Sequence, residues 1–249
     1  MIILKSLQEI EKIRKACLIV ADVLDAIRAE VKPGVSTQSL DEFAERFILA
    51  AGAKPAFKGY RGYPKTLCTS LNNEIIHGIP SSRVILKQGD IVSIDVGAIV
   101  EGFYGDAAVT MPVGTITPAA ERLIRVTEDS LARGIAQAQP GNHLYDISFA
   151  VQAHVEANGY SVVRDFVGHG IGRSLHEDPQ IPNFGERGRG PKLKPGMVLA
   201  IEPMVNAGKS DTIVQEDNWT AVTADSSLSA HFEHTIAIMA DGPWILTKK

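Results

Sequence analysis

The sequence predicts an α+β fold made of two similar halves, and three observations support this prediction. Helical hydrophobic periodicity followed by strand-like runs occurs twice along the chain, in the same order. Residues 93–110 have the alternation of a β-hairpin. No Gly/Ser-rich or low-complexity linker separates the two rounds. We therefore expect residues 1–249 to form a single domain, with pseudosymmetric halves at roughly 1–115 and 116–249.

The first half begins with two predicted helices. Residues 6–9 read SLQE, which is a capping box, and the apolar residues that follow keep the helical spacing as far as Ile27. The pair Pro33-Gly34 then interrupts the helical pattern. A second helix is expected from about Ser39 to Ala51, where a glycine follows.

A β-hairpin is predicted next, in the stretch SIDVGAIVEGFYGDAAVT at 93–110. Glu101 and Gly102 are suited to a two-residue turn, and each arm carries one aspartate, Asp95 or Asp106. With this turn the two aspartates are diagonal neighbours on one face, roughly 7–8 Å apart at the backbone. The other side chains on that face are small, whereas the opposite face is apolar and is expected to be core.

The second half repeats this order of helices and strands. A third helix is expected to begin at Thr117-Pro118 and to run to about Ala138, before Pro140-Gly141. A fourth helix is expected over about Leu144 to Asn158. The strand-like runs of this half are Ser161–Phe166, Met197–Val205 and Trp219–Met239.

Composition excludes several classes of protein. The net charge is −4, which gives no reason to expect nucleic acid or an anionic membrane as the main partner. No apolar run is long enough to span a bilayer, and the first residues do not resemble a signal peptide. Cys17 and Cys68 are too few for a disulfide scaffold or a cysteine-rich metal site. We therefore expect a cytoplasmic protein.

Four acidic residues interrupt apolar, strand-like runs that lack basic residues. They are Asp95 and Asp106 of the hairpin, Glu202 and Glu233. The stretches without Lys or Arg are residues 88–121, 195–208 and 210–247. A desolvated carboxylate without a countercharge costs several kcal/mol. Three alternatives remain. The acids are solvated at an exposed sheet edge, as in a purely structural domain, or one aspartate is protonated, or a bound metal supplies the positive charge.

Histidines complete a set of metal-binding residues. His169 lies between two glycines, which allow the backbone and a ligand to approach closely, and His77 and His176 are two further candidates. Two Asp, two Glu and one His form a hard, oxygen-rich set. Such a set suits two divalent ions of Mn, Fe, Co or Zn, bridged by carboxylates.

The remaining four histidines are not needed as ligands. His143 and His154 lie in or near the fourth helix without matching acids, so we expect them on the surface or in packing. His234 alternates with Glu233 and is expected to face away from the site. His231 shares the face of Glu233 and could touch it.

Five motifs resemble those of a known family in order and spacing. They are GYPKTLCTSLNNEIIHGIP, SIDVG followed by GDAAVT, GHGIG followed by LHEDP, IEPM, and HFEHT. The chain thereby resembles the methionine aminopeptidases over nearly its whole length, and its short form is similar to type I, the bacterial-like form. The resemblance implies the pita-bread fold, in which two pseudosymmetric halves surround a central antiparallel sheet and a dinuclear metal site lies between them.

The resemblance also implies an activity. Metallo-exopeptidases of this family remove the initiator methionine of nascent proteins when the second residue is small, and metal-activated water attacks the first peptide bond. The positions that match the family's metal ligands are Asp95, Asp106, His169, Glu202 and Glu233, with Asp106 and Glu233 bridging. His77 and His176 match histidines that contact the substrate and steady the tetrahedral intermediate. Glu202 is expected to relay a proton as well.

The pocket for the methionine side chain is similar in part. The positions that match its lining are Tyr60, Tyr63, Cys68 and Trp219. Phe57 stands where many members have Cys, Leu175 where many have Phe, and His231 where Gln is common. These departures concern the width of the pocket and not the chemistry.

The family resemblance further implies a monovalent cation, Na⁺ or K⁺, near Asn72, Glu74 and Ser229. The expected partner is the N-terminal methionine of nascent chains, near the ribosome, and we expect a monomer. Two rival functions share the same fold. One is a prolidase or aminopeptidase P, which usually carries an extra N-terminal domain. The other is a non-catalytic peptide-binding scaffold, which typically has lost metal ligands.

Overall fold

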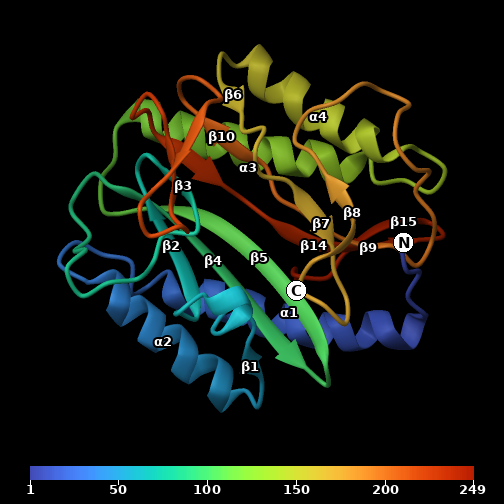
Figure 1. Cartoon of the computed structure of the whole chain (residues 1–249), viewed down its shortest axis with the longest axis horizontal. Coiled ribbons are helices and arrows are strands. Elements are labelled where there is room, and N and C mark those ends of the chain that lie inside the picture. Colours follow the sequence, from blue (N-terminus) through green and yellow to red (C-terminus); the bar gives the residue numbers. More distant parts are fainter.

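A computed structural model describes all residues, 1–249. The first half of the chain, blue to green in Figure 1, contains two α-helices, a short 3-10 helix and five strands. These elements are α1 (Leu7–Ile27), α2 (Thr37–Ala50), β1 (Lys54–Pro55), η1 (Tyr60–Gly62), β2 (Leu67–Leu71), β3 (Glu74–Ile76), β4 (Ile91–Val100) and β5 (Phe103–Pro112).

The two N-terminal helices begin at serine caps. In α1 the Ser6 hydroxyl accepts a hydrogen bond from the backbone N–H of Glu9, and the Glu9 carboxylate accepts one from the N–H of Ser6. The predicted capping box is thereby confirmed. Helix α2 begins at Thr37, two residues earlier than expected. The cap there is Ser36, whose hydroxyl accepts the N–H of Ser39.

The predicted hairpin is confirmed as β4 and β5, and it forms the centre of the first half. Glu101 and Gly102 both have positive φ, 51° and 79°, as a two-residue type I′ turn requires. Strand β4 pairs with β5 on one side and with β1 and β2 on the other. Its apolar face, including Val92, Ile94 and Val96, is fully buried in a cluster with residues of α1 and α2.

The second half contains two helices and ten short strands. These elements are α3 (Pro118–Ala136), α4 (Leu144–Ala157), β6 (Ser161–Val162), β7 (Gly168–Gly170), β8 (Glu177–Ile181), β9 (Val198–Ile201), β10 (Met204–Asn206), β11 (Thr212–Val214), β12 (Ala221–Thr223), β13 (Ser229–His231), β14 (His234–Met239) and β15 (Gly242–Ile245). Both helices agree with the sequence prediction to within two residues at each end.

The strand predictions for this half were too long. The run at 161–166 contains only the two-residue β6. The run at 197–205 breaks at Glu202-Pro203 between β9 and β10, because proline has no N–H to donate to a sheet. The run at 219–239 divides into β12, β13 and β14, which belong to three different sheets.

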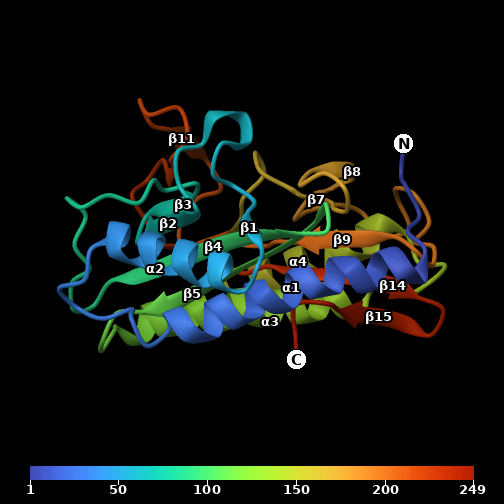
Figure 2. The ribbon, with the colours of Figure 1, turned by 90° about the horizontal axis from the view of Figure 1, so that it is seen from below.

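Every strand pair in the molecule is antiparallel. The second half is organised around a five-stranded sheet in the order β15-β14-β9-β7-β8. Helices α1 and α3 lie on the same face of the strands, whereas the loops around β3, β8 and β11 lie on the opposite face (Figure 2). None of the helices combines the length and the apolar character that crossing a bilayer requires.

The two halves meet along the outer edge of β5. The N–H of Glu233 donates to the carbonyl of Ala108 at 2.9 Å. One residue pair further on, the N–H of Asp106 donates to the Thr235 hydroxyl at 3.3 Å, and that hydroxyl donates to the carbonyl of Asp106 at 2.8 Å. This junction brings the acidic residues of the first half beside those of the second.

Candidate active site

The hairpin places the carboxylates of Asp95 and Asp106 at the junction between the halves. Asp95 pairs with Ala108, and Asp106 pairs with Gly97, so the aspartates are diagonal neighbours as the turn predicts. The side chain of Asp106 is only 6% exposed, and residues 233–235 cover the edge of its strand. The alternative of acids solvated at an open sheet edge is therefore excluded for Asp106.

The second half contributes a histidine and two glutamates to the same place. His169 on β7 lies with its Nε2 3.5 Å from Oε1 of Glu202 and 4.0 Å from Oδ2 of Asp106. Ligand atoms of Asp106, His169 and Glu233 all lie within 4.8 Å of one another, and all three residues are buried. The Nδ1 of His169 is hydrogen-bonded to the carbonyl of Gly170 at 2.9 Å, which leaves Nε2 directed at the carboxylates.

The side-chain atoms at this centre fit a divalent metal. Oδ1 of Asp95, Oδ1 of Asp106 and Oε1 of Glu233 are buried and have no hydrogen-bond partner. Buried polar atoms in proteins are almost always paired, so three unpaired carboxylate oxygens around one cavity call for a cation. No Lys or Arg forms an ion pair with any of the four acids.

Burial also shifts the protonation of these groups. Desolvation raises the pKa of Asp95 to about 7 and that of Glu202 to about 8. Desolvation, followed by repulsion between the carboxylates, raises the pKa of Asp106 and Glu233 well above the usual range. The same burial lowers the pKa of His169 to about 3, so its ring is neutral near pH 7, the form that binds metals.

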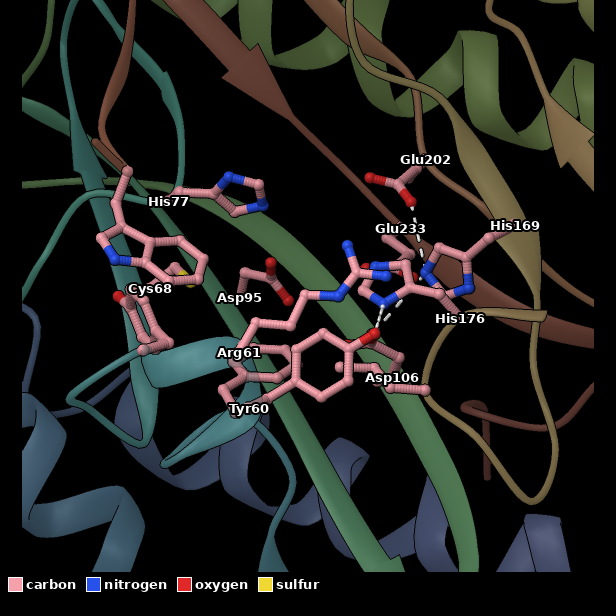
Figure 3. Close-up of a pocket in the computed structure, with 14 residues that line it drawn as sticks. Tyr60, Arg61, Cys68, His77, Asp95, Asp106, His169, His176, Glu202 and Glu233 are labelled. Atoms are coloured by element: carbon pink, nitrogen blue, oxygen red, sulfur yellow. Dashed lines mark hydrogen bonds and ion pairs between the residues drawn. The ribbon is translucent and has the colours of Figure 1, made fainter. Parts of the chain in front are cut away.

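A cavity of about 160 Å³ opens onto this centre (Figure 3). Besides Asp95, Asp106, His169, Glu202 and Glu233, its lining residues are Phe57, Tyr60, Arg61, Tyr63, Cys68, His77, Leu175, His176 and Trp219. All the residues that the family resemblance assigns to the metal site and to the methionine pocket therefore lie around one cavity. Phe57 and Leu175, which depart from the family pattern, are in contact with it too.

The two histidines that are expected to contact the substrate, His77 and His176, pack against aromatic neighbours. The Nδ1 of His176 and the hydroxyl of Tyr60 are hydrogen-bonded at 2.8 Å, and the two rings stack. The ring centroid of His176 also lies 4.3 Å from that of His169. The ring of His77 makes an edge contact with Trp219. Burial lowers the pKa of His77 to about 4 and also lowers that of His176, so both rings are neutral near pH 7.

His231 makes a contact with a different acid from the one expected. Its Nε2 lies 3.6 Å from Oε2 of Glu202, and it forms no ion pair with Glu233. Its backbone N–H donates to Thr110 and that of Glu233 to Ala108, so both residues lie along β5, and the shared face stays a prediction. As predicted, His234 does not line the cavity: its Nδ1 is hydrogen-bonded to the Thr247 hydroxyl.

The surface and packing histidines also lie away from the centre. The backbone N–H of His143 donates to Asp146 at the start of α4, and His154 lies further along the same helix. Neither is among the lining residues of the cavity.

Sequence reasoning missed Arg61, which lines the cavity even though the acidic strands lack basic residues. It lies in η1, more than thirty residues before Asp95 in the chain, and only the tertiary fold brings it to the site. Its place between Gly59 and Gly62, in a segment rich in tyrosine, is the sequence feature that marks an exposed turn there.

The three residues expected near a monovalent cation lie close together in part. The carbonyl of Asn72 accepts a hydrogen bond from the N–H of Ser229 at 2.8 Å, and Asn72 has a positive φ of 53°. The Glu74 carboxylate accepts the N–H of Leu71 within the same turn. Asn72 and Ser229, far apart in the sequence, are therefore neighbours.

A buried centre of carboxylates and one histidine, opening onto an apolar pocket, defines a metal-dependent hydrolase. Comparison with known proteins agrees with this class. The model of metallopeptidase family M24 matches residues 11–240. The chain is 57% identical to a methionine aminopeptidase of Clostridium perfringens, over 99% of both chains. It therefore belongs to family M24, and the resemblance to methionine aminopeptidases drawn from its motifs is confirmed.

Solved structures show the same fold. A methionine aminopeptidase of Thermotoga maritima matches with a TM-score of 0.99 and 48% identity, over 100% of both chains. A prolidase of Pyrococcus horikoshii matches 99% of this chain with a TM-score of 0.80 and 25% identity, but only 64% of the prolidase is covered. The predicted pita-bread fold is confirmed by these neighbours.

Proposed function

We propose that this protein is a methionyl aminopeptidase that removes the initiator methionine from nascent proteins when the second residue is small. The observation that carries the proposal is a single cavity that joins five potential metal ligands to an apolar pocket. The relatives that match over the whole chain are methionine aminopeptidases, whereas the prolidase matches over only part of its own length. The set of ligands is complete, which argues against a scaffold without catalysis.

Five residues would hold the metals: Asp95, Asp106, His169, Glu202 and Glu233. Mn, Fe, Co and Zn all suit this set of oxygen and nitrogen ligands. When bound, two such ions supply a Lewis acid and a water that is acidic enough to act as a nucleophile near neutral pH. Asp106 and Glu233 would each hold the ions through a buried oxygen that has no other partner, and their ligand atoms lie within 4.8 Å of each other.

The residues of the chain then orient the substrate and move its protons. If the Tyr60 hydroxyl donates to Nδ1 of His176, the Nε2–H of that ring is free to donate to the scissile carbonyl oxygen, where negative charge develops. His77, also neutral, lies against Trp219 and would contact the peptide from the other side. Glu202 would take the proton of the nucleophile at a carboxylate oxygen and pass it to the leaving amine.

The methionine side chain would occupy the apolar end of the cavity. Tyr63 and Cys68 are buried there, and the ring of Trp219 makes an edge contact with Tyr63 at 5.0 Å between centroids. Phe57 narrows this end, because its ring takes up the space beside Gly97 of β4. We expect this pocket to accept an unbranched side chain better than a branched one.

Several finer proposals follow from this function. The enzyme would act on nascent chains near the ribosome, and hence in the cytoplasm, as a monomer and without specificity for nucleic acid. The backbone around Asn72, Glu74 and Ser229 would bind Na⁺ or K⁺. The hydrogen bonds between Asp106 and Thr235 support treating residues 1–249 as one metallopeptidase domain.

A direct test uses metal-stripped protein restored in turn with Mn, Fe, Co or Zn. Each form is given the peptides Met-Ala-Ser, Met-Ile-Ser and Ala-Pro-Ser, and the products are followed by mass spectrometry. We expect metal-dependent loss of methionine from Met-Ala-Ser alone. Cleavage of Ala-Pro-Ser instead would identify a proline-specific peptidase, and no cleavage with any metal would favour a scaffold.

A further inference from the structure

The cationic side chain at the mouth of the cavity belongs to Arg61, and its backbone is strained. Arg61 has φ 49° and ψ 24°, in the left-handed region, between Gly59 and Gly62, which also have positive φ. A bulky residue pays a conformational penalty there that glycine does not. Strain of this kind in a residue that lines a cavity points to a role for its side chain.

The guanidinium group is directed across the cavity mouth. Figure 3 shows it extending from the turn toward His176, and its charge contributes to the lowered pKa of that histidine. It also lies 5.4 Å from the ring centroid of Tyr60, whose hydroxyl is hydrogen-bonded to His176. The position of the positive charge is therefore linked to the residues that would contact the scissile peptide bond.

Arg61 has no anionic partner within the protein. It forms no ion pair and no side-chain hydrogen bond, and the residue is exposed. Neutralising the buried acids would not be its role, because two divalent ions held there would cancel the charges of the four carboxylates. The partner that remains is an anion that arrives with the substrate.

We propose that Arg61 is a specificity-determining residue that binds a carboxylate just beyond the scissile bond of the peptide. The methionine side chain occupies the buried end of the cavity, so the rest of the peptide must leave across the exposed rim where Arg61 lies. The second residue must be small, which makes the third residue the first one free to carry an acidic side chain. A guanidinium group binds a carboxylate with two parallel hydrogen bonds. This inference rests on the proposed function.

The C-terminal carboxylate of a short peptide offers the same chemistry as an acidic side chain. A tripeptide such as Met-Ala-Ser places its terminal carboxylate on the third residue, within the same reach. Comparing kcat/KM for the free acid and for the amide of that tripeptide measures the contribution of the terminal carboxylate separately. In a nascent chain only the acidic side chain is present.

The test compares two peptides that differ only in charge, Met-Ala-Asp-Trp-amide and Met-Ala-Asn-Trp-amide. For the natural protein we expect kcat/KM to be about two- to fivefold higher for the aspartate peptide, the range of an exposed ion pair. The difference should lie mainly in KM, because Arg61 would contact the third residue of the peptide and not the reacting carbonyl itself. Salt at 0.5 M should reduce the preference by screening.

Variants separate a contact with Arg61 from a general effect of charge. Arg61→Gln should bring the ratio of the two peptides close to one, and Arg61→Lys should keep part of it. Arg83→Gln removes the same charge from an exposed position outside the cavity and should keep the full ratio. A ratio of one in the natural protein, or an unchanged ratio in Arg61→Gln, would overturn the inference. Absence of turnover of either peptide would overturn the proposed function and this inference with it.

Discussion

At the scale of single residues, His169 shows how close packing of the backbone aims a ligand. Gly168 and Gly170 flank it on β7, and neither has a positive φ. A Cβ atom on Gly168 would overlap the carbonyl of Ala200, and one on Gly170 would overlap the carbonyl of Asp178. The glycines are required because neighbouring strands approach here, and the approach fixes the position of the imidazole.

Replacement of the Asp106 carboxylate should impair metal binding but not folding. Asp106→Asn keeps the shape of the side chain, so the protein should fold. Activity should fall by more than about 100-fold, since even residues behind the metal ligands are worth about 10–100-fold. Circular dichroism would report the fold, and mass spectrometry of Met-Ala-Ser would report turnover. Retained turnover would contradict a bridging role for this carboxylate.

The buried carboxylates also predict how the metal-free protein responds to pH. The pKa values of Asp95 and Glu202, about 7 and about 8, lie above those of the unfolded chain, so the folded state binds more protons and stability falls as pH rises through them. The lowered pKa values of His77 and His169 act in the opposite direction, but only below about pH 6.5, the unfolded value. Between pH 6.5 and 8.5 the carboxylates therefore dominate.

We expect the Tm of the metal-free protein to fall across this interval, from pH 6.5 to 8.5. Asp106→Asn should show a smaller fall, because one of the repelling carboxylates is gone. Differential scanning calorimetry at several pH values would measure both slopes. A Tm that stays constant across the interval would mean that the carboxylates are already ionised at neutral pH without metal.

At the scale of elements, the hairpin was predictable and the later strands were not. Alternation over ten residues in each arm and a two-residue turn are local features, and they determine β4 and β5 almost by themselves. The strands of the second half are mostly three to five residues long and change sheets at bends such as Glu202-Pro203. Those bends depend on contacts with the other half of the molecule, which no local pattern records.

Gly105 of β5 allows α1 to lie against the hairpin. A Cβ atom there would lie 2.5 Å from the backbone nitrogen of Cys17, so Gly105→Ala must displace the helix. We expect it to lower the free energy of unfolding by about 3 kcal/mol or more, the cost of overpacking against rigid backbone. Gly102→Ala is the control. A Cβ atom at Gly102 would meet only open space, so this variant should lose only about 1–2 kcal/mol of the free energy of unfolding, the strain of alanine at a φ of 79°. Urea unfolding would compare them, and equal losses would contradict the packing argument.

A buried ion pair connects the loop that carries His176 to the N-terminal segment of the chain. Lys5 Nζ lies 2.6 Å from Oε2 of Glu177, and the two side chains are only 5% and 10% exposed. The other oxygen of Glu177 accepts the N–H groups of Arg173 and Ser174, so one carboxylate organises the whole loop. Lys5→Met would leave this carboxylate buried without its cation, and the free energy of unfolding should drop by about 3–5 kcal/mol.

A matched exposed pair provides the comparison for Lys5→Met. Lys12 lies 3.5 Å from Glu101, and both side chains are more than 40% exposed. Lys12→Met should cost at most about 1 kcal/mol. Urea unfolding would measure both variants. A similar decrease in the free energy of unfolding for the two would contradict the prediction that the buried ion pair of Lys5 stabilises the protein more than an exposed pair.

At the scale of the whole molecule, the candidate metal centre joins the two halves. Asp95 and Asp106 come from the first half, and His169, Glu202 and Glu233 from the second. The sequence identified the four acids by their place in apolar strands without cations, and the family resemblance selected His169 from three candidate histidines. It did not identify Arg61 or the contact between His231 and Glu202, because both arise only when distant segments pack together.

Metal binding should therefore stabilise both halves together. At a free Mn²⁺ concentration of about 100 times Kd, linkage adds about 2.7 kcal/mol to the free energy of unfolding. For a chain of this size that corresponds to a rise in Tm of roughly 5–10 °C. We expect one transition that moves as a unit, and Asp106→Asn should not respond. Two separate transitions, with only one moved by Mn²⁺, would show that the ions do not join the halves.

The spacing of the proposed metal ligands along the chain has a consequence during synthesis. Asp95 and Glu233 are 138 residues apart, as 233 − 95 gives, and elongation at about 5–20 residues per second separates them by roughly 7–28 s. Once Asp106 has been added, the growing polypeptide holds both aspartates but still lacks Glu233, whose backbone N–H pairs with the edge of β5. With Glu233 as a metal ligand, as proposed, each new molecule of this protein is expected to be inactive during its synthesis and to become active only after residue 233 has left the ribosome.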